Sequence, residues 1–369
     1  MKIVADSKIP FLEGVLEPFA EMIYLSPEKI DADAVRDADA LIIRTRTKCD
    51  AALLEGSNVK MIATATIGYD HIDRAYCERK GIVWKSAPGC NASSVGQYVL
   101  SALSLLMSQR NETLRGKTLG IVGVGNVGKA VERVCRIAGM NILRNDPPRA
   151  EAEGDADFVD LETIARECDV ITFHTPLIRE GAHPTQHLAD ESFFSKLGNN
   201  PVIINAARGE VIDEKAMMKA YEEQRISEMI IDCWEHEPKI NRELLAKTYL
   251  STPHIAGYSA DGKSNATRMA VEHIARFFGL HPDLSSIQPP AAQNPVIDLS
   301  QYDANPEVEA LLRTYDPRED SARLRESPET FEKQRGDYPL RREYSAYTLY
   351  NTPLREQSLF RELGFDVKE

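Results

Sequence analysis

Short apolar runs rich in β-branched residues recur at nearly regular intervals in the first ninety residues. They lie at Lys2–Asp6, Met22–Ser26, Ala40–Thr45, Met61–Ala65 and Ile82–Ser86. Runs of this length and composition are typical of buried strands, and the segments between them are long enough for crossover helices. The alternation predicts a small α/β domain with a parallel sheet of about five strands.

After residue 92 the apolar positions follow the period of a helix. They recur three or four residues apart, at Val95, Val99, Leu103 and Leu106. Ser93 or Ser94 is a suitable N-cap for such a helix. The spacing predicts an amphipathic helix from Ser93 to about Gln109, which leads into a second domain.

A glycine-rich turn joins a strand to a helix at the start of this second domain. It reads Gly123-Val-Gly125-Asn126-Val127-Gly128. Gly123 permits the tight turn, Gly125 lets the backbone approach a pyrophosphate, and Gly128 lets the helix pack closely on the strand. The turn therefore predicts a dinucleotide whose phosphates lie at the N-terminus of the helix.

The next strand supplies the acidic residue that such a site uses. Asn141–Asn145 is followed by Asp146, 18 residues after Gly128. A carboxylate at this place accepts the adenosine ribose hydroxyls and repels a 2′-phosphate. Although Arg149 lies nearby, Asp146 favours NAD over NADP as the cofactor.

Candidate catalytic residues follow the later strands. Strands are predicted at Asp169–Thr175, Val202–Ala207, Met229–Trp234 and Tyr249–Pro253. Thr175, Arg208, Asp232 and His254 each end or directly follow one of these strands, and Glu237 comes five residues after Asp232. Ligands of open parallel sheets bind beyond the carboxyl ends of the strands. Taken singly, each residue is more often a surface or capping residue, but their joint placement predicts a site.

These residue types suit the oxidation of a 2-hydroxy acid, which needs a base for the hydroxyl proton and a cation for the carboxylate. His254 can be the base, because an imidazole titrates near neutral pH. Glu237, bonded to the other ring nitrogen, would fix its tautomer and raise its pKa. Arg208 offers a planar fork for a carboxylate. The cofactor would then accept a hydride from the same carbon.

Composition limits the classes of partner. The chain has 369 residues and a net charge of −13, which disfavours nucleic acid and anionic membranes, so a phosphorylated substrate needs a local cationic cluster. The start of the chain has no signal-like apolar core, and no run approaches the roughly 18 apolar residues of a membrane span. With six scattered cysteines and no C-x-x-C pair, we expect a cytoplasmic protein with reduced thiols.

We expect no metal site. His183 and His187 are four residues apart but lie in a segment that contains glycine and proline and lacks a matching acidic third ligand. Loop histidines are the simpler interpretation.

Together these motifs resemble the D-isomer-specific 2-hydroxyacid dehydrogenase family, in which a glycine-rich turn and a later acid precede Arg, Glu and His. The resemblance runs through Thr64–Asp73, Ala87–Ala92, Gly120–Gly128, Asp146–Ala150, Thr172–Leu177 and His254–Tyr258. It is strongest to a branch of the family that oxidises 4-phospho-D-erythronate with NAD on the pathway to pyridoxal 5′-phosphate. The resemblance implies catalytic roles for Arg208, Glu237 and His254.

The resemblance also implies the ligand contacts. NAD would be contacted by the glycine-rich turn (Gly123, Gly125, Asn126, Val127 and Gly128) and by Asp146, Thr175, Asp232 and Gly257. The substrate would be contacted by Thr45, Thr66 and Tyr258. For its phosphate we expect Arg44 or Arg46, which with Lys48 would share one face of a strand; a solvated basic edge is the alternative.

The implied fold is α/β with three parts. Residues 1–93 and 257–285 would form a flavodoxin-like substrate domain, residues 94–256 a Rossmann NAD-binding domain, and residues 286–369 a C-terminal α+β domain that makes a homodimer. The substrate would lie in the cleft between the first two. Six of the 13 tyrosines fall within residues 302–350, a composition typical of an interface; a tail folded on its own subunit is the alternative.

Other functions remain open at this point. The nearest is a dehydrogenase for another acid, such as 3-phosphoglycerate or glycerate. A non-catalytic, NAD-sensing binding protein like a corepressor has the same fold, but Thr66, Tyr258 and the tail disfavour it. A methyltransferase would explain the glycine-rich turn and the acid, but not the later order of Arg, Glu and His.

Overall fold

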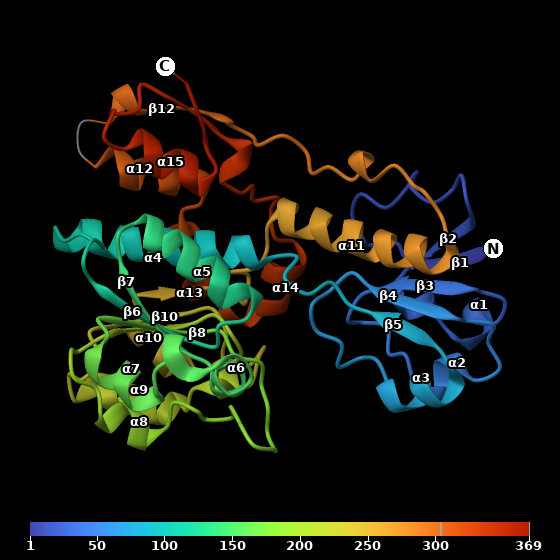
Figure 1. The fold of residues 1–369 in the computed structure, drawn as a ribbon, viewed down its shortest axis with the longest axis horizontal. Helices are drawn as coiled ribbons and strands as arrows, with labels where there is room; N and C mark the ends of the chain where they lie inside the picture. The colour runs from blue at the N-terminus through green and yellow to red at the C-terminus, as the bar shows by residue number, and fades with distance from the viewer. Residues whose placement is uncertain (303–304, 369) are drawn as a thin grey trace. The chain divides into compact units, whose positions relative to one another are not determined.

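The computed structural model describes residues 1–302 and 305–368. By their contacts these residues form two compact units. The first comprises Met1–Asn91 and Ser259–Pro290, and the second Ala92–Tyr258 with the chain from Ala291 onward. Each unit is built on a parallel sheet (Figure 1). The prediction of two parallel α/β domains is confirmed.

The first unit is a five-stranded parallel sheet in the order β2-β1-β3-β4-β5. Its strands are β1 (Lys2–Asp6), β2 (Glu21–Leu25), β3 (Ala40–Ile43), β4 (Met61–Thr64) and β5 (Val83–Lys85), and its helices are α1 (Ala32–Val35), α2 (Ala51–Leu54), α3 (Arg74–Lys80) and α11 (Ala260–Phe278). α11 packs Ala270, Val271 and Ile274 against one face of the sheet. The returning segment after residue 258 therefore completes the core of this unit.

The second unit contains a six-stranded parallel sheet in the order β11-β10-β9-β8-β6-β7. The strands are β6 (Thr118–Val122), β7 (Asn141–Asn145), β8 (Val170–Phe173), β9 (Val202–Asn205), β10 (Glu228–Ile231) and β11 (Leu250–Ser251). The helices are α4 (Ala92–Arg110), α5 (Asn126–Ile137), α6 (Pro147–Glu153), α7 (Leu161–Glu167), α8 (Glu191–Ser195), α9 (Glu214–Glu222) and α10 (Arg242–Lys247).

Alternate residues of these strands are buried on opposite faces of the sheet, as the period of two requires. Ile204 and Ile230 pack with α4 and α5 on one face, whereas Ile203 and Ile231 pack with α7 to α10 on the other. Both faces are therefore covered, and only the strand ends are available for a ligand.

The C-terminal segment packs on the second unit. It contains a three-stranded parallel sheet of β12 (Val296–Asp298), β13 (Thr348–Tyr350) and β14 (Asp366–Val367), with α12 (Pro306–Thr314), α13 (Pro317–Glu326), α14 (Phe331–Gly336) and α15 (Gln357–Leu363). α12 contacts α4, α13 contacts β11 and α15 contacts α5. The segment thus shares a core with the sheet and its helices.

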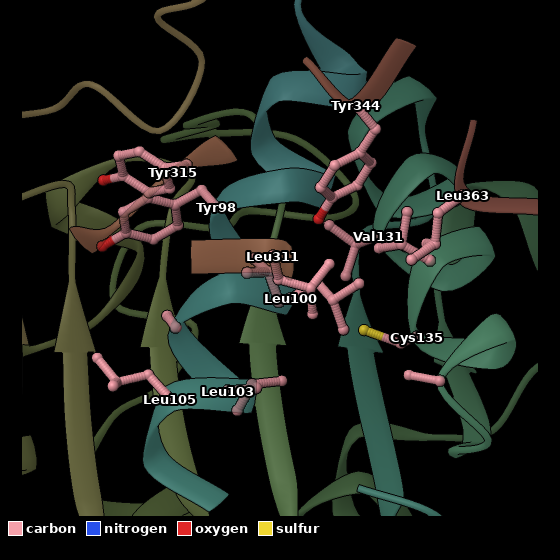
Figure 2. Close-up of a cluster of buried hydrophobic side chains, with 14 of the residues drawn as sticks. Tyr98, Leu100, Leu103, Leu105, Val131, Cys135, Leu311, Tyr315, Tyr344 and Leu363 are labelled. Atoms are coloured by element: carbon pink, nitrogen blue, oxygen red, sulfur yellow. The ribbon is translucent and has the colours of Figure 1, made fainter. Parts of the chain in front are cut away.

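α4 corrects the prediction of an amphipathic helix, because it is buried on all sides. α5 lies so close that a Cβ on Gly96 would be 3.2 Å from the carbonyl oxygen of Ala130. On the other side, the amide of Gln97 donates to Thr314 Oγ1 at 3.1 Å. Figure 2 shows side chains of α4 between those of α5 and of the C-terminal segment. Polar residues in the middle of α4, such as Gln97 and Ser101, are therefore buried.

Several strands end earlier than predicted. β3 ends at Ile43, and β10 ends at Ile231. Cys233 and Trp234 are still buried beyond the end of β10, because the loops that leave the sheet pack against its core. All six cysteines are free and buried, and no helix of the described residues is long and apolar enough to cross a membrane.

Candidate active site

The candidate catalytic residues lie at one edge of the second unit's sheet. β8, β9, β10 and β11 are neighbours in the sheet and run parallel. Thr175, Arg208, Asp232 and His254 each follow the carboxyl end of one of them. Because carboxyl ends of parallel strands meet at one edge, four residues from a stretch of eighty are gathered there.

His254 and Glu237 form a close pair. The Nδ1 atom of His254 lies 2.9 Å from Oε2 of Glu237 and 3.1 Å from Oε1. Since an ionised carboxylate only accepts, Nδ1 carries the proton and Nε2 keeps its lone pair. Among the described residues no group is hydrogen-bonded to Nε2. The side chain of His254 is 26% exposed, so Nε2 can meet a substrate.

The charge of Glu237 is stabilised by its neighbours. Burial raises the pKa of this carboxyl, but the hydrogen bond and charge of His254 and the N–H of Trp234 outweigh it, so the pKa lies below its usual value. The Trp234 N–H donates to Oε1 at 2.9 Å. Glu237 is therefore a carboxylate that can stabilise an imidazolium.

Asp232 holds the loop that carries His254. Its carboxylate accepts hydrogen bonds from Thr252 Oγ1 at 2.7 Å and from the N–H groups of Ile255 at 2.7 Å and Ala256 at 3.0 Å. Its carbonyl accepts the N–H of His254 at 2.8 Å. His254 itself has a positive φ of 55°, which is strained for a residue with a side chain. Asp232 thus fixes the position of the base.

Arg208 stands on a turn that requires a glycine after it. A Cβ on Gly209 would lie 1.9 Å from the carbonyl oxygen of Trp234, so the turn after β9 packs directly on the loop that carries Glu237. The Arg208 side chain is exposed, and its Nη1 donates to Ala207 O at 2.7 Å. Gly209 was not identified from the sequence, because its contact is with a loop 25 residues further along the chain.

The glycine-rich turn has the geometry of a dinucleotide site. A Cβ on Gly128 would lie 2.2 Å from the carbonyl oxygen of Gly123, whose φ is 89°. Gly125 is the N-cap of α5 and makes no side-chain cap bond, so the first N–H groups of α5, from Asn126 and Val127 onward, are available to an anion. The turn therefore fits a pyrophosphate.

Asp146 and Arg149 favour NAD over NADP. Asp146 Oδ2 accepts the N–H of Val124 at 2.8 Å, which places the carboxylate beside the turn. Arg149 forms a bidentate ion pair with Glu153, at 2.7 and 2.6 Å, so its charge is already neutralised. Thr175 Oγ1 is buried and has no hydrogen-bond partner among the described residues, which leaves it for a ligand. Gly257 follows the anchored loop at Ala256.

The predicted substrate residues of the first unit lie in two loops. Thr66 Oγ1 contacts Thr64 Oγ1 at 2.6 Å and donates to Gly68 O at 3.0 Å, whereas Thr45 is exposed. The prediction that Arg44, Arg46 and Lys48 share a strand face is wrong, because β3 ends at Ile43.

The three cations of this loop also differ in their partners. The Nε and Nη2 atoms of Arg44 contact the buried Asp6 carboxylate at 2.8 and 3.2 Å. Lys48 lies 2.9 Å from Asp50, and Arg46 is exposed. Arg44 therefore already forms an ion pair with Asp6, at the carboxyl end of β1.

Cys233, Glu237 and His254 each place one ligand atom within 4.8 Å of the others. Burial raises the pKa of the Cys233 thiol well above its usual value, so the thiolate that a metal needs is disfavoured. His183 and His187 face different carboxylates, Glu151 at 3.0 Å and Glu235 at 2.7 Å. The absence of a metal stays a prediction, and the cluster's chemistry is that of the His254–Glu237 pair.

A parallel sheet with this turn and a histidine–glutamate pair at its carboxyl edge defines a dinucleotide-dependent dehydrogenase. In agreement, residues 103–256 match the model of the D-isomer specific 2-hydroxyacid dehydrogenase NAD binding domain, and residues 290–364 match a domain of unknown function.

Curated relatives cover nearly the whole chain. A protein of Bacteroides thetaiotaomicron is 54% identical over 95% of this chain and 99% of its own. A protein of Porphyromonas gingivalis is 44% identical over 99% of this chain and 100% of its own. A protein of Marinobacter nauticus is 42% identical over 100% of both chains. All three are named erythronate-4-phosphate dehydrogenase. The chain therefore belongs to the erythronate-4-phosphate dehydrogenase family of the D-isomer-specific 2-hydroxyacid dehydrogenases.

Solved structures show the same fold. A 3-phosphoglycerate dehydrogenase of Entamoeba histolytica with bound NAD+ has a TM-score of 0.61 and 28% identity, over 76% of this chain and 95% of its own. A D-lactate dehydrogenase of Aquifex aeolicus, complexed with NAD and lactic acid, has a TM-score of 0.59 and 24% identity, over 78% and 100%. Each leaves more than a fifth of this chain unmatched.

Proposed function

We propose that this chain oxidises 4-phospho-D-erythronate to 2-oxo-3-hydroxy-4-phosphobutanoate in pyridoxal 5′-phosphate biosynthesis. NAD is its cofactor. The observation that carries the proposal is the His254–Glu237 pair at 2.9 Å, with Nε2 of His254 open to a substrate. The names of the relatives supply the substrate, and the paired residues supply the chemistry that it needs.

The proposed residues divide the work of the reaction. Arg208 holds the substrate carboxylate with its planar fork and polarises the oxygen on C2. His254 Nε2 takes the proton of the 2-hydroxyl group, and Glu237 stabilises the imidazolium that forms. NAD, when bound, accepts the hydride that leaves C2. The 2-hydroxyl thereby becomes a carbonyl, and the proton later leaves His254 for solvent.

The remaining proposed contacts are those that the resemblance to the family implies. Gly123, Gly125, Asn126, Val127 and Gly128 would bind the pyrophosphate of NAD, with Asp146 at the adenosine ribose and Thr175, Asp232 and Gly257 nearer the reacting end. Thr45, Thr66 and Tyr258 would contact the substrate. The carboxylate of Asp232 already accepts hydrogen bonds from Thr252, Ile255 and Ala256 and a weaker one from the Cys233 thiol, so any contact with NAD uses its remaining lone pairs.

NADH formation tests the reaction. Purified protein is incubated with NAD and each of 4-phospho-D-erythronate, 3-phosphoglycerate, glycerate and D-erythronate, and absorbance of NADH is followed. We expect the highest kcat/KM with 4-phospho-D-erythronate. A clear preference for 3-phosphoglycerate would overturn the substrate, and no turnover with any acid would favour an NAD-sensing binding protein.

We propose a homodimer formed through the C-terminal segment. This segment exposes large apolar side chains: Val296 is 59% exposed and Leu354 is 88% exposed. Such residues are candidates for a contact with a second copy. Removing the whole segment would uncover the core around α4, so point changes are the better test.

Light scattering of the full chain gives the oligomeric state. We expect a dimer that Val296→Asp or Leu354→Asp weakens, whereas Ile178→Asp, at another exposed apolar residue, leaves it intact. A monomeric wild type would refute the proposal. The six free cysteines support a cytoplasmic location, where thiols stay reduced.

A further inference from the structure

Arg335 brings a cation from the C-terminal segment to the candidate active site. It lies on α14, and its Nη2 atom is 3.5 Å from the hydroxyl of Tyr258, four residues after His254. The guanidinium carbon is 6.0 Å from the centre of the Tyr258 ring and 5.9 Å from that of Phe331. Both rings therefore help to hold the arginine in place.

No carboxylate of residues 1–302 or 305–368 pairs with one edge of this guanidinium. Nη1 of Arg335 contacts Glu332 at 3.0 Å. Nε is buried without an acceptor among the described residues, and Nη2 makes only the long contact with Tyr258. In Arg44 the same two atoms, Nε and Nη2, close on the carboxylate of Asp6. Nε and Nη2 of Arg335 thus form an edge of two donors that suits an oxyanion. The side chain as a whole is 23% exposed. Because Nε itself is buried, an anion that pairs with both donors has to displace the groups that cover Nε.

Arg335 also lies within electrostatic reach of the catalytic pair. Burial, the largest influence, raises the pKa of Glu237, and the charge of Arg335 is among the influences that lower it. The same arginine acts on the pKa of Cys233, as Arg208 does. Arg208, on the turn after β9, and Arg335, in the C-terminal segment, therefore both act on the loop between Asp232 and Glu237.

We infer that Arg335 binds the phosphate of the substrate. The inference rests on the proposed function, in which Arg208 takes the carboxylate and His254 the 2-hydroxyl, so the distal phosphate is the charged group left without a partner. A planar fork whose Nε has no acceptor among the described residues, and whose Nη2 makes a long contact with Tyr258, matches two phosphate oxygens. In a chain of net charge −13 such a dianion needs a local cation.

The location of Arg335 gives it a role in specificity. It lies within residues 290–364, which form a family model of their own outside the NAD-binding model. None of the residues proposed to contact NAD lies in this range. Arg335 acts on the choice of substrate, and Arg44, already paired with Asp6, is a weaker candidate than the sequence indicated.

The test compares a phosphorylated with an unphosphorylated acid. KM and kcat are measured for 4-phospho-D-erythronate and D-erythronate with the wild type, Arg335→Ala, Arg335→Lys and the control Lys333→Ala, which removes an exposed cation from the same helix. Losing charge-assisted hydrogen bonds should raise KM for the phosphorylated acid about 10- to 100-fold in Arg335→Ala. KM for D-erythronate and kcat should change far less. Arg335→Lys should lie between, and Lys333→Ala should match the wild type.

Binding of NAD, measured by calorimetry, shows that each variant is folded. If Arg335→Ala loses NAD binding, Arg335→Lys replaces it in the test. The role of Arg335 is then judged from the ratio of the KM for 4-phospho-D-erythronate to the KM for D-erythronate in that variant. If KM rises equally for both acids, or for neither, the role of Arg335 is overturned while the proposed function stays intact. If the wild type does not turn over 4-phospho-D-erythronate, the proposed function fails, and the inference fails with it.

Discussion

Replacing Glu214 by glutamine should make the protein more stable at neutral and alkaline pH. Glu214 begins α9 and is only 5% exposed. Its Oε1 accepts the N–H of Glu235 at 2.8 Å, two residues before Glu237. Burial, with smaller contributions from the charges of Glu235 and Glu237, raises the pKa of Glu214 to about 7.

The sign follows from proton linkage. The folded pKa of about 7 exceeds the usual value of 4.5, so the native state holds the Glu214 proton more tightly than the unfolded chain does. The stability contributed by the protonated group is present below pH 4.5 and is lost as the pH rises to about 7. The difference corresponds to about 3 kcal/mol of unfolding free energy. Glutamine keeps the acceptor for Glu235 and removes the charge.

Urea unfolding of the NAD-free protein, followed by tryptophan fluorescence between pH 5 and pH 8, measures the effect. Glu214→Gln should exceed the wild type by only about 1 kcal/mol at pH 5 and by up to about 3 kcal/mol at pH 8. Glu222→Gln, at an exposed position of the same helix, should follow the wild type throughout. If Glu214→Gln ran parallel to the wild type across this range, Glu214 would not carry a raised pKa.

Three further predictions concern the site. Glu237→Gln removes the charge that stabilises the His254 imidazolium, so kcat should fall about 100-fold or more while NAD affinity, measured by calorimetry, stays unchanged; retained turnover would show that the pair is not catalytic. Gly128→Ala places a Cβ 2.2 Å from Gly123 O, at a cost of about 1–3 kcal/mol, and NAD affinity should fall; normal affinity would contradict the tight turn. Asp146→Asn should narrow the preference for NAD over NADP, read as the ratio of the two kcat/KM values, because it removes the repulsion of a 2′-phosphate.

The sheet and the grouping of the candidate site residues could be predicted because their signals are local. Strands appear as apolar runs, and parallel connection brings their carboxyl ends to one edge, so Arg208 and His254 could be grouped without coordinates. The ends of the strands could not be predicted, because apolar residues remain buried in the loops that follow the strands. The interpretation of α4 as amphipathic was wrong for a related reason: its polar face is covered by a segment two hundred residues away.

Contacts between distant parts of the chain were beyond sequence reasoning. Gly209 is required because it touches the peptide after Trp234, and nothing in its own surroundings marks that contact. Arg335 is 77 residues from Tyr258, in a segment rich in charged residues where one arginine looks like another. Arg44 and Arg46 were preferred because they adjoin Thr45, but Arg44 is held by the carboxylate of Asp6, which is 38 residues away in sequence.

The placement of Arg335 also answers an electrostatic problem that the catalytic loop creates. Asp232, Glu235 and Glu237 lie within six residues of one another, and the substrate that must approach this loop carries a carboxylate and a phosphate. Arg208 can balance one of the two anionic groups. A second cation from outside the sheet lowers the repulsion at the other, and it adds no charge to the strands, where burial would penalise it. A segment that packs on α4 and reaches Tyr258 can therefore adapt a common NAD-binding unit to a phosphorylated acid.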